Sequence, residues 1–139
     1  MVDAGIDRDV CKLVHEFARR LDVHVRRVGE EVGLTPTQVV ALRELSEPIT
    51  ARELASRMAC EASNATFVID RLEEQGLVQR RPHPTDRRAK ELVLTAAGRD
   101  ARAGVLDRLD RASPLISLGR EQQETLVELL RELVGPQGR

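Results

Sequence analysis

The residues on the two sides of Gly76 follow different patterns, and this change limits the folds that the chain can adopt. From Ala62 to Gln75, apolar residues recur at the steps of an amphipathic helix. Gly76 then stands where a left-handed helix cap belongs. Beyond it, residues 77–81 and 89–94 suit two short strands, because Pro82-His83-Pro84 cannot lie inside a helix. The sequence therefore predicts a helix followed directly by a β-hairpin.

A shorter helix is predicted immediately before this pair. Thr50 and Glu53 have the spacing of a capping box, and apolar residues continue the helix to about Met58. A short helix, a tight turn, a second helix and a hairpin form the order of a winged helix-turn-helix. We therefore predict a mainly α fold of about six helices with a two-stranded β wing.

Further helices flank this region on both sides. The chain is expected to form a single domain over residues 1–139, with a winged helix-turn-helix lobe at 35–96. Amphipathic helices are predicted within 7–32 and 97–134, with a break at Ser113-Pro114. The core of the lobe needs only one face of each helix, so the remaining apolar faces fit a helical dimerisation region. A twofold dimer would read two half-sites about 10 bp apart or a multiple of this spacing.

The second helix of the predicted motif has a polar outward face near its N-terminus. Its inward residues are Ala65, Val68, Ile69 and Leu72, and its outward or flanking residues are Ser63, Asn64, Thr66, Phe67, Asp70 and Arg71. Asn can pair with adenine, and Ser or Thr can bond to bases or phosphates. Small polar residues near a helix start are often only caps, but the neighbouring hairpin favours DNA contact here. Phe67 has two open interpretations: contact with thymine methyl groups, or packing beneath the preceding helix or wing.

Basic residues gather in the predicted wing, although the whole chain has a net charge of −1. The cations between positions 80 and 90 are Arg80, Arg81, Arg87, Arg88 and Lys90, and Asp86 is the one acid. An Arg at a hairpin tip is thin enough to enter a minor groove, which predicts DNA contact by Arg87 and Arg88. Asp86 is expected to hold one of these arginines by a charge-assisted pair. Taken alone, the Asp-Arg-Arg tripeptide would be read as a solvated turn.

Nothing in the sequence predicts an enzyme, a cofactor or a metal site. Cys11 and Cys60 are too few for a disulfide scaffold, and the three histidines have no metal-ligand spacing. No glycine-rich phosphate loop or nucleophile elbow occurs. No signal peptide and no apolar run of membrane-spanning length is present, so a cytoplasmic protein without a membrane partner is expected.

The run from Thr50 to Gly98 resembles the multiple-antibiotic-resistance regulator (MarR) family of bacterial transcription factors. The pieces that carry the resemblance are DRLEEQGLV, DRR and LTAAG, and the order of flanking helices extends it over nearly the whole chain. The resemblance implies a homodimer, with the first and last two helices interlocked and two winged lobes on a palindromic operator. Asp86 and Arg88 match the family's wing motif, and its DNA-contacting positions fall on Ser63, Asn64 and Thr66. Many members have Arg or Gly where this chain has Phe67.

The resemblance also implies a mode of regulation. Many members release DNA when a small lipophilic anion or phenol binds between the dimer helices and the winged lobe, and others sense oxidants through Cys. The redox class with a reactive Cys in the first helix pairs it with Tyr, and this chain has no Tyr. The leading expectation is therefore a repressor released by a small-molecule inducer, lipophilic or phenolic. The alternatives are a redox regulator acting through Cys11, or a winged-helix module that binds protein.

Overall fold

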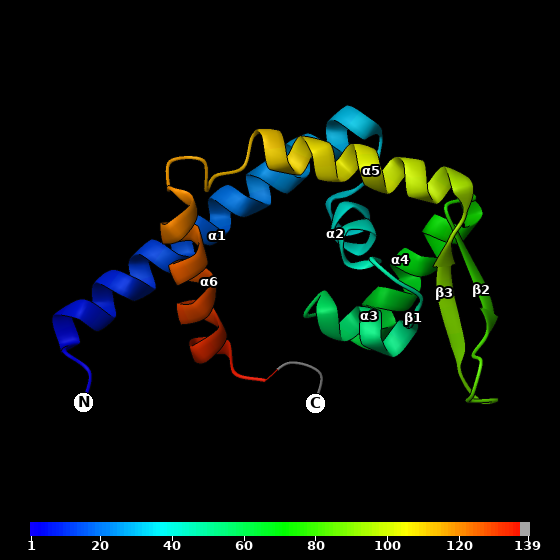
Figure 1. Ribbon diagram of the computed structural model, residues 1–139, viewed down its shortest axis with the longest axis horizontal. Coiled ribbons are helices and arrows are strands. Elements are labelled where there is room, and N and C mark those ends of the chain that lie inside the picture. The colour runs from blue at the N-terminus through cyan, green and yellow to red at the C-terminus, as the bar shows by residue number, and fades with distance from the viewer. Residues whose placement is uncertain (137–139) are drawn as a thin grey trace.

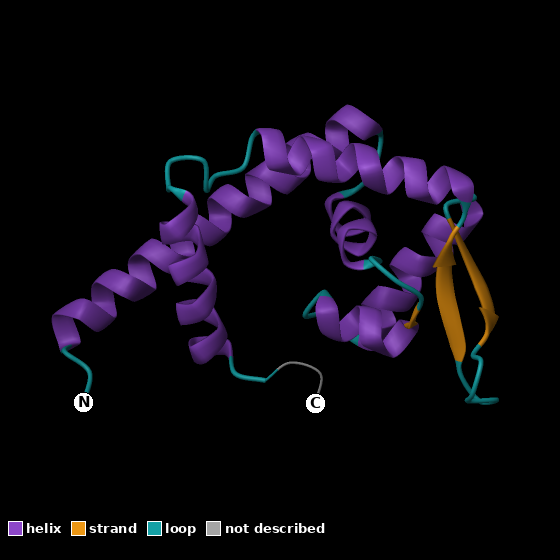
Figure 2. Cartoon of the chain, in the orientation of Figure 1, coloured by secondary structure: helices purple, strands orange, loops and turns teal. Residues whose placement is uncertain are grey.

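The computed structural model describes residues 1–136, and within them it contains six helices and three strands. In chain order these are α1 (Ala4–Val32), α2 (Pro36–Glu44), β1 (Ile49–Thr50), α3 (Ala51–Arg57), α4 (Ala62–Glu74), β2 (Val78–Pro82), β3 (Lys90–Leu94), α5 (Ala96–Arg111) and α6 (Arg120–Val134). Figures 1 and 2 show a compact lobe built from α2, α3, α4 and the strands, with α1, α5 and α6 extending away from it. The mainly α, winged helix-turn-helix fold predicted from the sequence is confirmed.

Side-chain caps fix where the helices begin. Thr35 and Thr50 each accept a hydrogen bond from the backbone three residues ahead, and both form capping boxes, of which the one at Thr50 is predicted above. Thr95 caps α5 in the same way. The first helix starts earlier than predicted, at Ala4, because the Asp3 carboxylate accepts hydrogen bonds from the N–H groups of Gly5 and Ile6.

Two left-handed residues shape the turns at the ends of α3 and α4. Gly76 has φ of 74°, and the N–H of Leu77 donates to the carbonyl of Leu72 at 2.9 Å, as a Schellman cap requires. The turn between α3 and α4 instead uses Ala59, at φ of 54°. A left-handed conformation costs a residue with a side chain about 1–2 kcal/mol, so this tight turn is held by the packing of the two helices around it.

The wing belongs to a three-stranded antiparallel sheet with strand order β1-β3-β2, and the predicted two-stranded hairpin was incomplete. β2 pairs with β3 from Val78 opposite Leu94 to Pro82 opposite Lys90. The missing strand is β1, in which Ile49 pairs with Leu92. Its two residues are too few to show a strand period, and Ile49 is buried because this pairing places it against the core.

One hydrophobic core lies in the lobe and at its junction with α1 and α5. The four inward residues predicted for α4 are all buried, and so are Val28 of α1 and Val105 of α5. The buried amide of Gln38 is satisfied, since it donates to the Gln75 side chain at 2.8 Å and accepts from the N–H of Thr35. No helix among residues 1–136 combines the length and the hydropathy needed to cross a membrane.

The N-terminal part of α1 and the whole of α6 contribute no buried residue to this core. The buried residues of α1 are Val28 and Gly29 alone, and α6 has none. Within the described residues, α6 packs extensively against no other helix or strand. Large apolar side chains on both helices are exposed, among them Ile6, Val10, Leu13, Val14, Val127, Leu129, Leu130, Leu133 and Val134.

Candidate nucleic-acid interface

The outward face of α4 presents the predicted side chains to solvent. Burial of the opposite face against the core turns this one outward, and it exposes Ser63, Asn64, Thr66, Phe67 and Arg71. Phe67 is 65% exposed, so of its two interpretations the one in which it packs beneath the preceding helix or wing is wrong. An exposed aromatic ring beside two polar residues is a surface suited to contact with another molecule.

The N-terminus of α4 is open. Its N-cap, Glu61, makes no capping hydrogen bond through its side chain, so the first N–H groups of the helix keep their capacity for an anion. The hydroxyl of Thr66 already donates its hydrogen to the carbonyl of Ala62 at 3.0 Å, so it has no further hydrogen to donate. The Thr66 oxygen can still accept a hydrogen bond, whereas no side-chain hydrogen bond within the described residues occupies Ser63 or Asn64.

The tip of the wing is held in shape by hydrogen bonds from side chains to backbone. The Nδ1 atom of His83 accepts from the N–H groups of Thr85 at 3.2 Å and Asp86 at 3.1 Å. The Asp86 carboxylate accepts from the N–H of Arg88 at 3.0 Å. The prediction that Asp86 pairs with a guanidinium is therefore wrong, because its short side chain reaches the backbone two residues ahead. Asp86 shapes the turn, and Arg87 and Arg88 remain exposed.

The wing is less basic than its sequence indicates, because two of its arginines are paired. Arg80 bonds to Asp70 at 2.8 Å and Glu73 at 2.6 Å, both on α4. Arg81 bonds at 2.6 Å to the buried carboxylate of Glu91 across the β2–β3 ladder. Among residues 1–136, the cations of this hairpin without a carboxylate partner are therefore Arg87, Arg88 and Lys90. They lie at or beside the tip.

Arg80 is a positioning residue that sequence reasoning missed. Its hydrogen bond to Asp70, followed by the charges of the two acids, raises the pKa of its guanidinium, and burial opposes this rise. The double contact ties strand β2 to α4 and thereby sets the position of the wing relative to this helix. Asp70 and Glu73 are three residues apart and so share one side of α4, a signal that could have indicated a basic partner.

The helix face and the wing tip belong to the same lobe. Figure 1 shows the β2–β3 hairpin extending past the helices of the lobe, with its tip at the lower edge of the view. A helix with a polar, uncapped N-terminus suits a major groove, and a thin basic hairpin beside it suits a neighbouring minor groove. Arg80 keeps the two parts in a fixed relation. The arrangement can therefore contact adjacent grooves of one duplex.

The remaining reactive side chains form no catalytic or metal centre within the described residues. Cys11 is exposed on α1 and Cys60 is half-buried beside the core. No cluster of three or more His, Cys, Asp or Glu side chains that could hold a metal ion is found in this part of the chain.

Comparison with known proteins agrees with this geometry. The sequence pattern of the MarR family matches residues 34–90. A putative transcriptional regulatory protein for the hcr operon of Thauera aromatica is 30% identical over 142 aligned residues, covering 90% of this chain and 86% of that protein. The repressor CouR, bound to a 23-mer DNA duplex, has a TM-score of 0.73 at 26% identity, with 97% and 99% coverage of the two chains. NadR in complex with 4-hydroxyphenylacetate has a TM-score of 0.77 at 27% identity, with 86% and 88% coverage. The chain is thus a DNA-binding transcriptional regulator, not an enzyme, and it belongs to the MarR family.

Proposed function

We propose that this regulator is a homodimeric repressor that binds an inverted-repeat operator and releases it when a small molecule binds. The observation that carries the proposal is the open, polar N-terminus of α4 beside a wing tip with unpaired Arg87 and Arg88. The similar protein CouR occurs bound to a DNA duplex, which supports the same use of this surface here. The proposed DNA contacts are Ser63, Asn64, Thr66, Phe67, Arg71, Arg87 and Arg88, with Asp86 shaping the wing.

The exposed apolar faces of α1 and α6 support the dimer. An isolated amphipathic helix of 15 residues is marginally stable in water, so α6 needs a surface against which its apolar face can pack. The exposed apolar residues of α1 offer a surface of the same character. Two copies of the chain that exchange these faces would bury both sets. Residues 7–32 and 97–134 are accordingly proposed as the dimerisation region, and residues 35–96 as the DNA-binding lobe.

Replacing Arg88 with Ala tests the wing directly. We expect operator affinity to fall at least roughly tenfold, since a charge-assisted contact to DNA is lost from each lobe. The slope of log affinity against log salt concentration should also become shallower by about one for each contact removed. The measurement is a salt series of binding titrations with the operator, identified first by genome-wide capture of bound DNA.

Arg26→Ala is the matched control for this variant, because Arg26 is exposed on α1 and is not among the proposed DNA contacts. It removes the same charge and should leave both affinity and salt slope close to those of the parent protein. Equal salt slopes for Arg88→Ala and the parent protein would remove the wing from the DNA interface.

Phe67 is proposed to contact a thymine methyl group in the major groove. Replacing thymines of the operator one at a time with deoxyuridine removes only the methyl group. At one position per half-site we expect a loss of about fourfold, the effect of exposing one buried methyl group. Phe67→Ala should lose affinity for the thymine operator and become insensitive to this replacement. An effect of deoxyuridine that persists in Phe67→Ala would assign the methyl contact to another residue.

The inducer is proposed to be a small organic molecule of the lipophilic or phenolic kind that the family resemblance implies. NadR in complex with 4-hydroxyphenylacetate, a phenol that also carries a carboxylate, supports a ligand of this size. Addition of the inducer should release operator DNA without unfolding the dimer.

A further inference from the structure

Two arginines bond to the C-terminal end of α2, the first helix of the winged lobe. The last carbonyls of a helix lack the partner that the next turn would supply. Arg102 of α5 bonds to two of them: its Nε donates to the carbonyl of Leu42 at 2.9 Å, and its Nη2 donates to that of Arg43 at 3.1 Å. Arg57 of α3 donates to the next carbonyl, that of Glu44, at 3.2 Å. The end of α2 is therefore held from two sides.

Arg57 joins α2 and α3 into one unit. Figure 1 shows α2 lying between α5 and α3, and α2 packs against both. Besides the carbonyl of Glu44, Arg57 bonds at 2.6 Å to Glu47, in the turn that follows α2. Leu42 of α2 and Leu54 of α3 are both fully buried in the shared core. The two helices are therefore expected to move together as part of the lobe.

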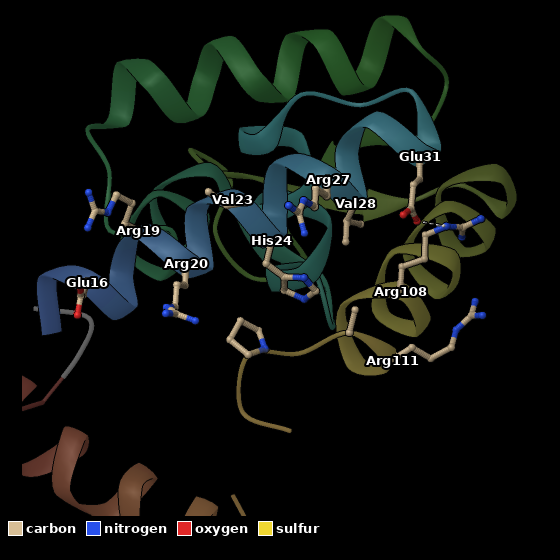
Figure 3. A pocket seen from close by; sticks show the side chains of 12 residues that line it. Glu16, Arg19, Arg20, Val23, His24, Arg27, Val28, Glu31, Arg108 and Arg111 are labelled. Carbon is tan, nitrogen blue, oxygen red and sulfur yellow. Dashed lines mark ion pairs between the residues drawn. The ribbon is translucent and has the colours of Figure 1, made fainter. Parts of the chain in front are cut away.

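A separate set of contacts joins α5 to α1. Arg108 of α5 bonds to Glu31 of α1 at 3.3 Å, beside the pocket drawn in Figure 3. His24 of α1 extends into the same region, and its Nε2 donates a hydrogen bond to the carbonyl of Leu109 at 2.9 Å. Neither contact involves a residue of the lobe. The second half of α5 is thus tied to α1.

Arg102 is the polar link between these two units. Within residues 1–136 it supplies the only hydrogen bonds between α5 and α2. The other attachment of α5 to the lobe is at its start, where the Thr95 hydroxyl donates to the carbonyl of Gly76 at 2.6 Å. Arg102 follows Thr95 by two helical turns, about 10 Å along the axis. Two separated points fix the direction of a helix, whereas a single point lets it pivot.

Apolar packing between α5 and the lobe restricts this pivoting less sharply. Val105 of α5 is buried in the core that the lobe shares. Hydrophobic contact is non-directional, and packed helices slide past each other by small shear motions. The planar guanidinium of Arg102, in contrast, holds two carbonyls at once in a fixed geometry. Without it, α5 can change its angle to α2 while the core stays covered.

We propose that Arg102 is a positioning residue that fixes the angle between the winged lobe and α5, and that it thereby narrows the range of half-site spacings that the regulator accepts. The second half of this inference rests on the proposed function. In a dimer held by α5 and its neighbours, this angle sets the separation of the two α4 helices. One added base pair moves a half-site by about 3.4 Å along the duplex and about 35° around it. A fixed angle does not follow such a displacement.

Operators with and without one base pair inserted between the half-sites test the spacing. The parent protein should lose at least about tenfold in affinity on the insertion, because protein or DNA must deform to bind. In Arg102→Gln this loss should be at least about threefold smaller, the effect of about one net hydrogen bond. A duplex with a single half-site should bind both proteins equally, because Arg102 is not among the proposed DNA contacts.

Arg99→Gln is the matched control. It removes the same charge from α5, but Arg99 donates to the carbonyl of Leu94, five residues before it, and not to α2. It should lose as much affinity on the insertion as the parent protein. An equal loss in Arg102→Gln would overturn the spacing role, and so would a lower half-site affinity, since the lobe itself would then be damaged. If Arg102→Gln does not fold, Arg102→Lys takes its place, because it keeps the charge but lacks the planar fork.

A distance measurement without DNA separates this inference from the proposed function. Spin labels are placed at two exposed positions, with Arg52→Cys on α3 and Asp110→Cys on α5, after both native cysteines are replaced by Ala. Dilution with unlabelled protein restricts the signal to distances within one chain. The distance distribution should be broader in Arg102→Gln than in the parent protein and in Arg99→Gln.

The two measurements have distinct failures. Equal widths in the three labelled proteins would overturn the role of Arg102 in fixing the angle. A broader distribution in Arg102→Gln, together with a parent protein that binds no inverted repeat, would refute the repressor and leave the positioning role of Arg102 intact.

Discussion

Leu129→Asn/Leu133→Asn is expected to convert the dimer to a monomer and to lower operator affinity by at least about a hundredfold. Both leucines are exposed in the single chain, at 53% and 76%, on a helix that packs extensively against no other helix or strand of residues 1–136. If a second copy covers them, polar replacements place unsatisfied amides in the interface. Each lobe would then bind its half-site alone and lose the gain from two linked contacts. Sedimentation and operator titration of the same samples measure both effects.

Glu128→Asp/Glu132→Asp is the matched control for this variant. These residues lie on the opposite, polar side of α6, and Asp lowers helix propensity about as much as Asn does. The control should remain a dimer with parental affinity. A leucine double variant that still sediments as a dimer would show that α6 does not form the interface.

Gly98→Ala is expected to destabilise the protein by about 2 kcal/mol or more. A Cβ atom at this position would lie 1.9 Å from the carbonyl oxygen of Leu77, which is backbone and cannot turn aside. That oxygen also accepts the N–H of Thr95 at 3.0 Å, and the Thr95 hydroxyl donates to the carbonyl of Gly76. The clash thus falls where α5 meets the base of the wing, and its cost exceeds the gain of about 1 kcal/mol from replacing Gly in a helix.

Gly104→Ala in the same helix provides the comparison. Its Cβ would meet only the end of the Arg108 side chain, at 3.2 Å, and that flexible group can move. This variant should be more stable than the parent by up to about 1 kcal/mol. Urea denaturation of the three proteins at one concentration measures the difference. A Gly98→Ala protein as stable as Gly104→Ala would mean that the junction between α5 and the wing can open without cost.

The sequence predicted most of the helices because their signals are local. Capping residues such as Thr50 and Thr95 and the left-handed Gly76 lie within a few positions of the turns that they form. The inward face of α4 follows from the period of its apolar residues, and the same period correctly turned Asn64 and Phe67 outward. The sequence did not decide whether another element covers Phe67. The period of a helix shows which way a side chain points, but it does not show whether a neighbouring helix or strand packs over that side chain.

The amino-acid sequence alone thus determined the order of helices, the wing and the face of α4 proposed to meet DNA. Only the tertiary structure decided that β1 completes the sheet, that Asp86 bonds to backbone, and that Arg80 is held by α4. It alone brought Arg102 to the end of α2, about sixty positions earlier in the chain. The physical reason is that hydrophobic period and capping act over a few residues, whereas an ion pair or a bond between two helices depends on distances between segments that the chain brings together only when it folds.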